Sequence, residues 1–379
     1  MINWFKKTLG EENVFVSDDY RAAYSTDASN IYGQAKLIVF PRSINDVHAI
    51  IMFAKRTKIA LTVRGGGTSL VGGVVPNDSV ILDMSRMNKI IKINEEEGYA
   101  IVEPGVVVNR LNSRLNDTFF PIALASGDAA TIGGVIATNA YSLIAHKFGA
   151  VRENIIALEV IDGTGKLYKI EDSFQFFCGR ECASGIITKA KLKLVPKINT
   201  KTELFNFDYV EEALSKFEDL KDGDIVAAEI FDTYCTSYLD SSGYVLAVQF
   251  SSERNEEHDV WKLRNKLSVL LTAENRFIVM IKMPLETVLV VLSSLKKEKM
   301  PYFGSVVTGV FFVHPKRDLK ELEKLIKLVE ANKGRIDVGG LGALKNQFVG
   351  REYLEKMEIL KNKYDPYGLF NNSVRLVRW

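Results

Sequence analysis

The stretch Arg64-Gly65-Gly66-Gly67-Thr68-Ser69-Leu70-Val71-Gly72-Gly73 decides the fold of this chain. It places five glycines within nine positions, so much of its backbone carries no side chain. Glycine also adopts positive φ angles readily, and successive backbone N–H groups can then turn toward one anion. The stretch therefore predicts a loop that holds a phosphate group. The alternative is an ordinary glycine-rich turn without a ligand.

The spacing of the glycines excludes two common phosphate-binding motifs. Gly67 and Gly72 have the separation of a P-loop, but Gly73-Val74 stands where that motif has Lys-Ser/Thr. The dinucleotide fingerprint G-x-G-x-x-G fails because Leu70 occupies the position of its last glycine. The neighbouring sequence must therefore decide what the loop binds.

Ordered motifs flank the loop. Residues 35–41 are typical of a strand ending at a proline, 45–57 of an amphipathic helix, and 59–63 of a strand leading into the glycines. Later motifs follow at 130–140, 147–155, 158–165 and 185–196. In this order the set resembles the FAD-binding domain of the vanillyl-alcohol-oxidase-like flavoproteins, also called the p-cresol-methylhydroxylase (PCMH) type. It is most similar to the branch of D-lactate dehydrogenases and glycolate oxidase subunits, strongly over roughly residues 20–197.

This resemblance implies FAD as the cofactor and assigns residues to its site. The first glycine loop would hold the pyrophosphate, and a second loop with the residues behind it would line the flavin ring and ribityl chain. A third segment would approach the cofactor edge, and the closing segment of the chain would return to the flavin. The assigned residues are Arg64, Gly65, Gly66, Gly67, Thr68, Ser69, Gly72, Ser126, Thr131, Gly133, Gly134, Thr138, Asn139, Gly185, Ile186, Ile187 and Asn371.

The same resemblance predicts non-covalent FAD. Some family members tether the flavin through a histidine in or beside the first glycine loop, and Thr68 occupies that position here. None of the four histidines, which are His48, His146, His258 and His314, falls within the motif.

Three motifs depart from the family pattern. In residues 179–186, Cys182 replaces a glycine and Arg180 a serine, which weakens the expected contacts on that side of the cofactor. The metal-binding motif of the 2-hydroxy-acid dehydrogenases aligns with residues 307–314, where Gly309 and His314 alone survive. The later acidic and histidine motif aligns with 336–342 and has lost both residues. A catalytic divalent ion needs three or more ligands, so we expect no metal site.

Two residues are candidates for substrate chemistry. Arg264 lies in Trp261-Lys262-Leu263-Arg264, which resembles a family W-x-x-R motif whose arginine offers a planar fork to a substrate carboxylate. The alternative is an arginine on a solvated helix face. His314 is a candidate proton acceptor for an alcohol, and the alternative is an ordinary histidine at a strand end before Pro315.

The length indicates two domains, and the alternation of expected strands and helices together with the resemblance indicates the α+β class. The chain has 379 residues, 47% of them hydrophobic, and a net charge of +2, which does not favour a nucleic-acid partner. We place a PCMH-type FAD-binding domain at 1–197 and a substrate or cap domain at 198–353, with a C-terminal segment at 354–379. Helices should cover one face of a mostly antiparallel sheet in the cap domain.

The three cysteines are expected to be buried free thiols. No signal peptide or apolar run of eighteen residues is present, so we expect a cytoplasmic protein, peripheral at the membrane at most.

Three functions fit this sequence. The first is an FAD-dependent oxidoreductase that oxidises a small 2-hydroxy acid of the D-lactate or glycolate class by hydride transfer to flavin N5. The second is an FAD-binding subunit of a larger glycolate-oxidase-like complex, with a partner flavoprotein or iron–sulfur subunit; a homo-oligomer is the other assembly considered. The third is a nucleotide-binding regulatory protein without redox turnover, which the completeness of the flavin motifs argues against.

Overall fold

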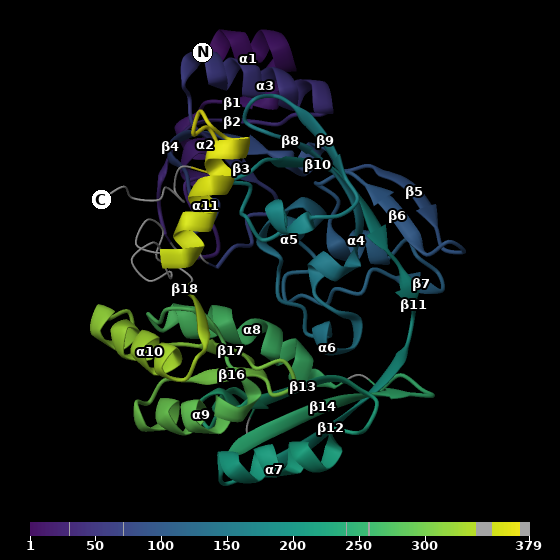
Figure 1. The fold of residues 1–379 in the computed structure, drawn as a ribbon, viewed down its shortest axis with the longest axis vertical. Coiled ribbons are helices and arrows are strands. Elements are labelled where there is room, and N and C mark those ends of the chain that lie inside the picture. Colours follow the sequence, from purple (N-terminus) through teal and green to yellow (C-terminus); the bar gives the residue numbers. More distant parts are fainter. Residues whose placement is uncertain (30, 71, 240, 257, 339–350, 372–379) are drawn as a thin grey trace.

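The computed structural model describes residues 1–371 except 30, 71, 240, 257 and 339–350. Its chain forms two parts, one above the other in Figure 1. The first part holds a four-stranded and a five-stranded sheet, and the second holds a seven-stranded sheet. The α+β class with antiparallel sheets that the sequence predicts is thereby confirmed.

The four-stranded sheet has the order β1-β2-β4-β3 and carries the glycine loop at the end of β3. Its strands β2, β4 and β3 run parallel, whereas β1 pairs antiparallel with β2. The elements are α1 (Ile2–Leu9), β1 (Val14–Phe15), α2 (Asp18–Ala23), β2 (Gln34–Val39), α3 (Ile44–Thr57), β3 (Leu61–Arg64) and β4 (Asn77–Asp83). Apolar residues of α1 and α3 pack on the buried side chains of these strands, which anchors β3 and fixes the start of the loop.

The five-stranded sheet is antiparallel throughout, in the order β5-β6-β10-β8-β9. Its buried face packs against α4, α5 and α11 in one hydrophobic core. The strands of this sheet are β5 (Ile90–Asn94), β6 (Tyr99–Val102), β8 (Ile155–Ile161), β9 (Leu167–Ile170) and β10 (Ile186–Lys193). Two short strands, β7 (Thr118–Phe119) and β11 (Val195–Pro196), pair with each other. The helices are α4 (Val108–Asn112), α5 (Ile132–Thr138), α6 (Ala145–Phe148) and α11 (Arg351–Tyr364). Strands β8 and β9 form a hairpin across residues 162–166.

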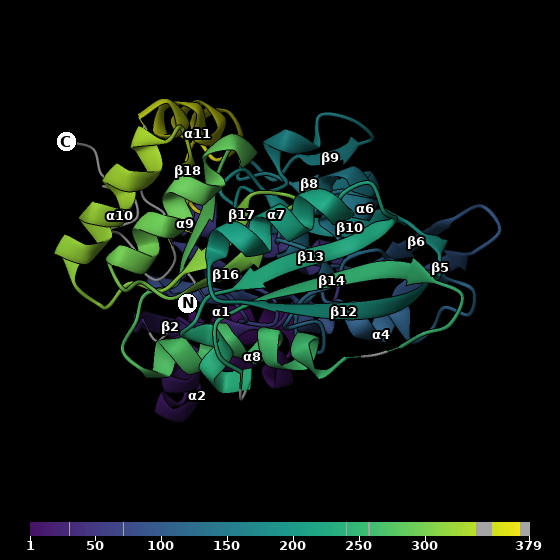
Figure 2. The same ribbon diagram turned by 90° about the horizontal axis from the view of Figure 1, so that it is seen from below.

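The second part is a seven-stranded antiparallel sheet with helices on both faces (Figure 2). Its strands are β12 (Asn199–Phe207), β13 (Ile225–Phe231), β14 (Tyr244–Ser252), β15 (Val279–Lys282), β16 (Tyr302–Ser305), β17 (Val310–Val313) and β18 (Arg335–Val338). Three helices cover one face, namely α7 (Val210–Leu220), α9 (Val288–Lys297) and α10 (Leu319–Ala331). The prediction of helices on one face alone is wrong, because α8 (Asp259–Ala273) buries Val260, Leu267 and Leu271 against the other face.

Polar and aromatic contacts join the two parts. Lys147 of α6 donates to the Asp224 carboxylate and, at 2.9 Å, to Ser251 Oγ. The ring of Tyr141 lies edge-on to Phe312 with centroids 5.7 Å apart. These contacts place the segment after α5 directly against the seven-stranded sheet.

The chain end returns to the first sheet, as Figure 1 shows for the segment after α11. Phe370 pairs in parallel with Leu61 of β3, which adds this segment to the edge of the sheet. The buried Asp365 carboxylate accepts the backbone N–H groups of Leu369 at 2.8 Å and Phe370 at 2.9 Å, and it pairs with Lys361 at 3.0 Å. Asn371 is the last described residue of the predicted closing segment.

None of the helices in the described residues combines the length and apolarity that a bilayer-spanning segment needs.

The return of the chain end gives the first prediction. Asp365→Ala leaves two backbone N–H groups without their acceptor and removes the carboxylate that pairs with Lys361, at a residue that is 2% exposed. Each unsatisfied buried group is destabilising, so we expect the free energy of unfolding to fall by about 2 to 4 kcal/mol in urea titrations. The control Glu358→Ala, on the exposed face of α11, should change it by less than about 0.5 kcal/mol. Equal losses in the two variants would contradict this role of Asp365.

Candidate functional site

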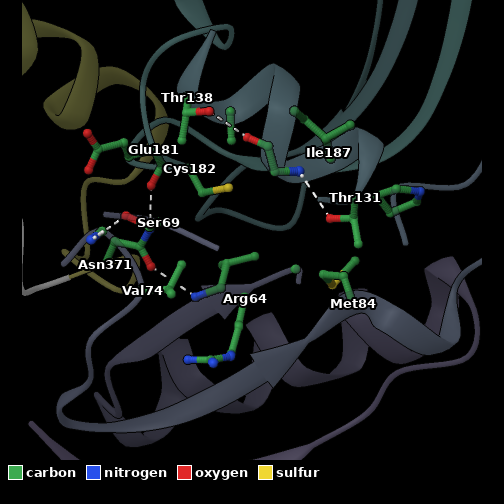
Figure 3. A pocket seen from close by; sticks show the side chains of 17 residues that line it. Arg64, Ser69, Val74, Met84, Thr131, Thr138, Glu181, Cys182, Ile187 and Asn371 are labelled. Carbon is green, nitrogen blue, oxygen red and sulfur yellow. Dashed lines mark hydrogen bonds between the residues drawn. The ribbon is translucent and has the colours of Figure 1, made fainter. Parts of the chain in front are cut away.

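The predicted motifs converge on one pocket (Figure 3). It lies where the loop after β3, helix α5 and the segment before β10 meet, and the C-terminal segment closes one side. Val63 and Asn371, 308 residues apart in sequence, are hydrogen-bonded in its wall. The lining residues are Val63, Arg64, Gly65, Ser69, Gly73, Val74, Met84, Pro104, Thr131, Gly133, Gly134, Ala137, Thr138, Glu181, Cys182, Ile187 and Asn371.

The glycine loop presents backbone N–H groups that have no acceptor within the described residues. No hydrogen bond joins the N–H groups of residues 65–68 to any described carbonyl or side chain. The chain bends at Gly67, where φ is 66°, and again at Gly72, where φ is 77°. Unpaired N–H groups on successive residues are what an anion-binding loop offers. The loop therefore fits a pyrophosphate group.

Helix α5 forms the facing wall. Thr131 caps its first turn, because the Oγ1 atom accepts the Gly134 N–H at 3.4 Å. A Cβ atom on Gly133 would lie 2.7 Å from Cβ of Pro104, so no larger residue fits there. A Cβ atom on Gly134 would meet only Thr131 Oγ1, at 3.3 Å. The free side of Gly134 therefore faces the pocket.

The two glycine segments touch each other. A Cβ atom on Gly65 would lie 2.2 Å from Thr131 Oγ1, and one on Gly66 would lie 2.0 Å from the Ala129 carbonyl oxygen. Both distances are far below van der Waals contact, so any side chain at these positions would force the loops apart. Gly65 and Gly66 are thus required by the packing of one loop on the other, in addition to any ligand.

A third wall comes from a strained turn before β10. Glu181 and Cys182 both have positive φ angles, 49° and 61°, which non-glycine residues rarely adopt. Cys182 is the residue that replaces a glycine of the resembled family, and it keeps a backbone conformation that favours glycine. Burial raises the pKa of its thiol to about 12, so the sulfur stays protonated. The three cysteines are unpaired, as predicted, but Cys182 is half-buried rather than buried.

Asn371 holds two walls together. Its Oδ1 atom accepts the Val63 N–H at 2.9 Å, and its Nδ2 atom donates to the Glu181 carbonyl. Its amide therefore fixes the distance between β3 and the strained turn, and one donor hydrogen of Nδ2 remains for a ligand.

Arg64 lines the pocket with its backbone while its guanidinium points elsewhere (Figure 3). Its Nη1 atom donates to the Thr26 carbonyl at 2.8 Å, and the guanidinium carbon lies 5.0 Å from the centre of the Tyr24 ring. Burial and the neighbouring Asp83 carboxylate raise the pKa of Tyr24 to about 12. Arg64 thus ties residues 24–26 to the loop.

Several predicted residues shape the walls without lining the pocket. Ile186 is fully buried opposite Ile161, and Asn139 ends α5 in a left-handed conformation with its Oδ1 atom accepting the Arg152 N–H. The Ser126 carbonyl accepts two N–H groups of its own turn. The complete set outside the lining is Gly66, Gly67, Thr68, Gly72, Ser126, Asn139, Gly185 and Ile186. The remaining nine of the seventeen predicted residues line the pocket.

Sequence reasoning missed the remaining lining residues. Glu181 and Cys182 had a usable signal, because they lie in the motif that departs from the family pattern. Gly73 also had a signal, because it belongs to the glycine stretch itself. The others, Val63, Val74, Met84, Pro104 and Ala137, reach the pocket through tertiary packing that no local pattern reveals.

Arg264 already has a carboxylate partner. Its Nε and Nη2 atoms donate to Glu229 at 2.8 and 2.9 Å in a two-pronged ion pair, and the Glu229 side chain is fully buried. Arg264 itself is 6% exposed, so the alternative of a solvated helix face is wrong. It does not line the pocket described above.

His314 is fully enclosed in the second part. Its ring stacks on Phe303 with centroids 5.9 Å apart, and neither ring nitrogen has a hydrogen-bond partner. Burial lowers the pKa of His314 to about 3, so the ring is neutral at ordinary pH. It does not line the pocket, and a proton-acceptor role for it stays a prediction.

Across the described residues, no group of three or more His, Cys, Asp or Glu side chains could hold a metal ion. Residues 339–342 of the second degraded motif lie outside this description. All four histidines are described, and none of them lines the pocket.

The glycine loop faces the first turn of α5, which begins with Ile132, Gly133 and Gly134. A mixed sheet lies on one side of this arrangement and an antiparallel sheet on the other, and the arrangement fits a flavin dinucleotide. Comparisons with known proteins agree with this assignment. Residues 35–171 match a family of FAD binding domains. Residues 35–171 thus carry an FAD binding domain, and the resemblance to PCMH-type flavoproteins that the sequence predicted is confirmed.

Curated relatives come from one branch of these flavoproteins. The chain is 32% identical to D-2-hydroxyglutarate dehydrogenase of Stutzerimonas stutzeri over 59% of its own length and 52% of the relative's. It is 31% identical to glycolate oxidase subunit GlcD of Bacillus subtilis over 58% and 49% of the two chains. For a mitochondrial D-lactate dehydrogenase (cytochrome) of Arabidopsis thaliana the identity is 30% over 55% and 39%. The chain thus matches about half or less of these relatives' lengths.

Solved structures share the fold along nearly the whole chain. The 4-ethylphenol oxidase of Gulosibacter chungangensis superposes with a TM-score of 0.77 at 17% identity, covering 98% of this chain and 95% of that one. An alkyldihydroxyacetonephosphate synthase gives 0.73 at 16% identity, with 98% and 84% covered. At these identities the likeness concerns the fold alone.

Two glycine substitutions separate packing from cofactor binding. Gly66→Ala should lower the unfolding temperature of the FAD-free protein by several degrees, because its methyl group meets the Ala129 carbonyl. Gly134→Ala should leave that temperature unchanged or higher, since alanine favours the helix, but should weaken FAD binding about tenfold or more by filling the pocket. Thermal unfolding and FAD titration by fluorescence measure the two effects. Unaltered FAD affinity in Gly134→Ala would mean that the pocket is not the FAD site.

The low pKa of His314 predicts acid sensitivity. The unfolded chain binds a proton near the ordinary pKa of 6.5, whereas the folded chain binds it near 3, so protonation favours unfolding as the pH falls below 6.5. Between pH 7 and pH 5 this residue should lower the free energy of unfolding by about 2 kcal/mol. His314→Leu should remove that loss in urea titrations at the two pH values, and the exposed control His48→Gln should retain it. An identical pH dependence in wild type and His314→Leu would refute this environment for the ring.

Proposed function

We propose that this chain binds one FAD molecule non-covalently in the pocket between the glycine loop and α5. The observation that carries the proposal is that Gly65, whose N–H has no described acceptor, and the open side of Gly134 both line this pocket. Non-covalent attachment is supported by the absence of any histidine from the lining and by the raised pKa of the Cys182 thiol, which leaves no ready nucleophile.

The residues of the pocket have distinct parts in this proposal. The N–H groups of residues 65–68 would donate to the pyrophosphate oxygens; Gly65 lines the pocket, and residues 66–68 follow it directly along the loop. The Thr131 hydroxyl accepts one bond from Gly134 and still has its own proton to donate. Apolar Met84, Pro104 and Ile187 exclude water from the rest of the cavity.

We propose further that the chain is an FAD-dependent oxidoreductase for a small 2-hydroxy acid of the D-lactate or glycolate class. When bound, FAD supplies the acceptor for the hydride of the substrate α-carbon, and the hydroxy acid becomes a 2-oxo acid. The names of the relatives support this substrate class, since they include a D-2-hydroxyglutarate and a D-lactate dehydrogenase.

A second candidate is an FAD-binding subunit whose substrate chemistry lies in a partner chain. One relative is a glycolate oxidase subunit. The specific observation in its favour is that neither Arg264, which is paired with Glu229, nor the enclosed His314 lines the pocket. An iron–sulfur or second flavoprotein chain would then pass or receive the electrons.

Anaerobic reduction distinguishes the two candidates. FAD-loaded protein should lose its yellow absorbance with D-lactate, glycolate or D-2-hydroxyglutarate under the first candidate, with L-lactate as the stereochemical control. Acid precipitation should release the flavin into the supernatant in either case. Flavin that dithionite reduces but no 2-hydroxy acid reduces would support the subunit candidate. Protein that takes up no FAD would contradict both.

A further inference from the structure

A buried ion pair lies where the two parts of the molecule meet. Arg264 on α8 binds Glu229 on β13 through two hydrogen bonds of 2.8 and 2.9 Å, and the side chains are 7% and 0% exposed. Parallel N–H donors to a carboxylate are the geometry in which an arginine recognises a carboxylate ligand. Glu229 therefore occupies the face of Arg264 that the W-x-x-R resemblance assigns to a substrate.

The surroundings of this pair are aromatic and close to the flavin pocket. The guanidinium carbon lies 5.5 Å from the ring centres of Phe303 and Phe312 and 5.9 Å from that of Tyr141. Tyr141 follows the pocket residue Thr138 by three positions, so the pair adjoins the segment that leaves the pocket. Rings on several sides keep the local dielectric constant low, and charges there interact strongly.

Charge balance decides what else this site accepts. Arg264 and Glu229 together are neutral, and a second carboxylate would leave one buried negative charge without a partner. A buried unpaired charge is penalised by several kcal/mol, more than the remaining hydrogen bonds to Arg264 return. A ligand without a carboxylate at this point carries no such penalty.

The groups that remain for a ligand are neutral. Tyr141 Oη and Thr308 Oγ1 are buried beside each other and beside Ser305, and neither makes a hydrogen bond of standard geometry. Burial and the Glu229 carboxylate raise the pKa of Tyr141, so its hydroxyl stays protonated and able to donate. Two hydroxyl groups suit the hydroxyl or carbonyl oxygen of a substrate better than an anion.

We propose that Glu229 is a specificity-determining residue: its carboxylate serves as an internal anion for Arg264 and excludes an external carboxylate from that arginine. The inference rests on the proposed flavin site for its place beside the substrate. It narrows that proposal, because a 2-hydroxy acid oxidised by this chain must bind its carboxylate away from Arg264, with only its hydroxyl or carbonyl oxygen near Tyr141.

Oxalate, a carboxylate that cannot give up a hydride, tests this inference. In wild type it should leave the unfolding temperature and the flavin spectrum unchanged. In Glu229→Gln the guanidinium has lost its anion, so oxalate should raise the unfolding temperature, with a half-maximal concentration about tenfold or more below any wild-type response. The control Glu159→Gln removes the carboxylate of the Lys189–Glu159 pair on the five-stranded sheet and should behave as wild type.

A double variant identifies the arginine as the binding group. Glu229→Gln with Arg264→Gln has no cation, so the response to oxalate should disappear. Wild type that binds oxalate as tightly as Glu229→Gln, or a double variant that responds like the single one, would overturn the proposal. If Glu229→Gln does not fold, wild type is compared with the double variant alone. Stabilisation of wild type by oxalate that the double variant lacks would overturn the proposal. Absence of oxalate stabilisation in both proteins would support it.

Measurements on FAD-free protein distinguish the role of Glu229 from the binding of FAD. The unfolding temperature is measured on FAD-free protein as well, and FAD content is determined independently. The expected oxalate pattern in a chain that takes up no FAD would sustain the role of Glu229 toward Arg264 while contradicting the proposed function.

Discussion

The structure depends on the direct contact between two glycine segments. Gly65 and Gly66 lie so close to Thr131 and Ala129 that a single added carbon would overlap them. This contact joins the mixed four-stranded sheet to the antiparallel five-stranded sheet and leaves a pocket beside the junction. Bare backbone is what lets the segments meet, and the N–H groups of residues 65–68 have no described acceptor beside this contact.

Hydrogen bonds between side chains and the backbone hold the other walls of the pocket. Asn371 bonds to Val63 on one side and to the Glu181 carbonyl on the other, and Asp365 fixes the segment that presents it. The left-handed conformations of Glu181 and Cys182 persist because these neighbours hold the turn. Walls held in place by contacts within the protein favour tight binding of a large cofactor, because less ordering is needed on binding.

The sequence predicted the α+β class, the glycine loop and the second glycine segment, since their strands, helices and glycines have local signatures. It could not predict that Gly65 serves packing as well as binding, because its neighbour Thr131 lies far away in the chain. The W-x-x-R motif located Arg264 but gave no sign of Glu229, which lies 35 residues earlier on a strand with an ordinary apolar pattern. The helix α8 was expected, yet the face that it covers depends on tertiary packing.

The central claim is that both glycine segments and the turn at 181–182 contact the same FAD molecule. Hydrogen–deuterium exchange with and without FAD tests it directly, because the N–H groups of residues 65–68 have no described protein acceptor and should exchange fast in the free chain. FAD should slow exchange in the glycine loop, in the first turn of α5 and in the turn at 181–182 together, with one saturation curve. Protection of only one of these segments, or of none at saturating FAD, would contradict the account.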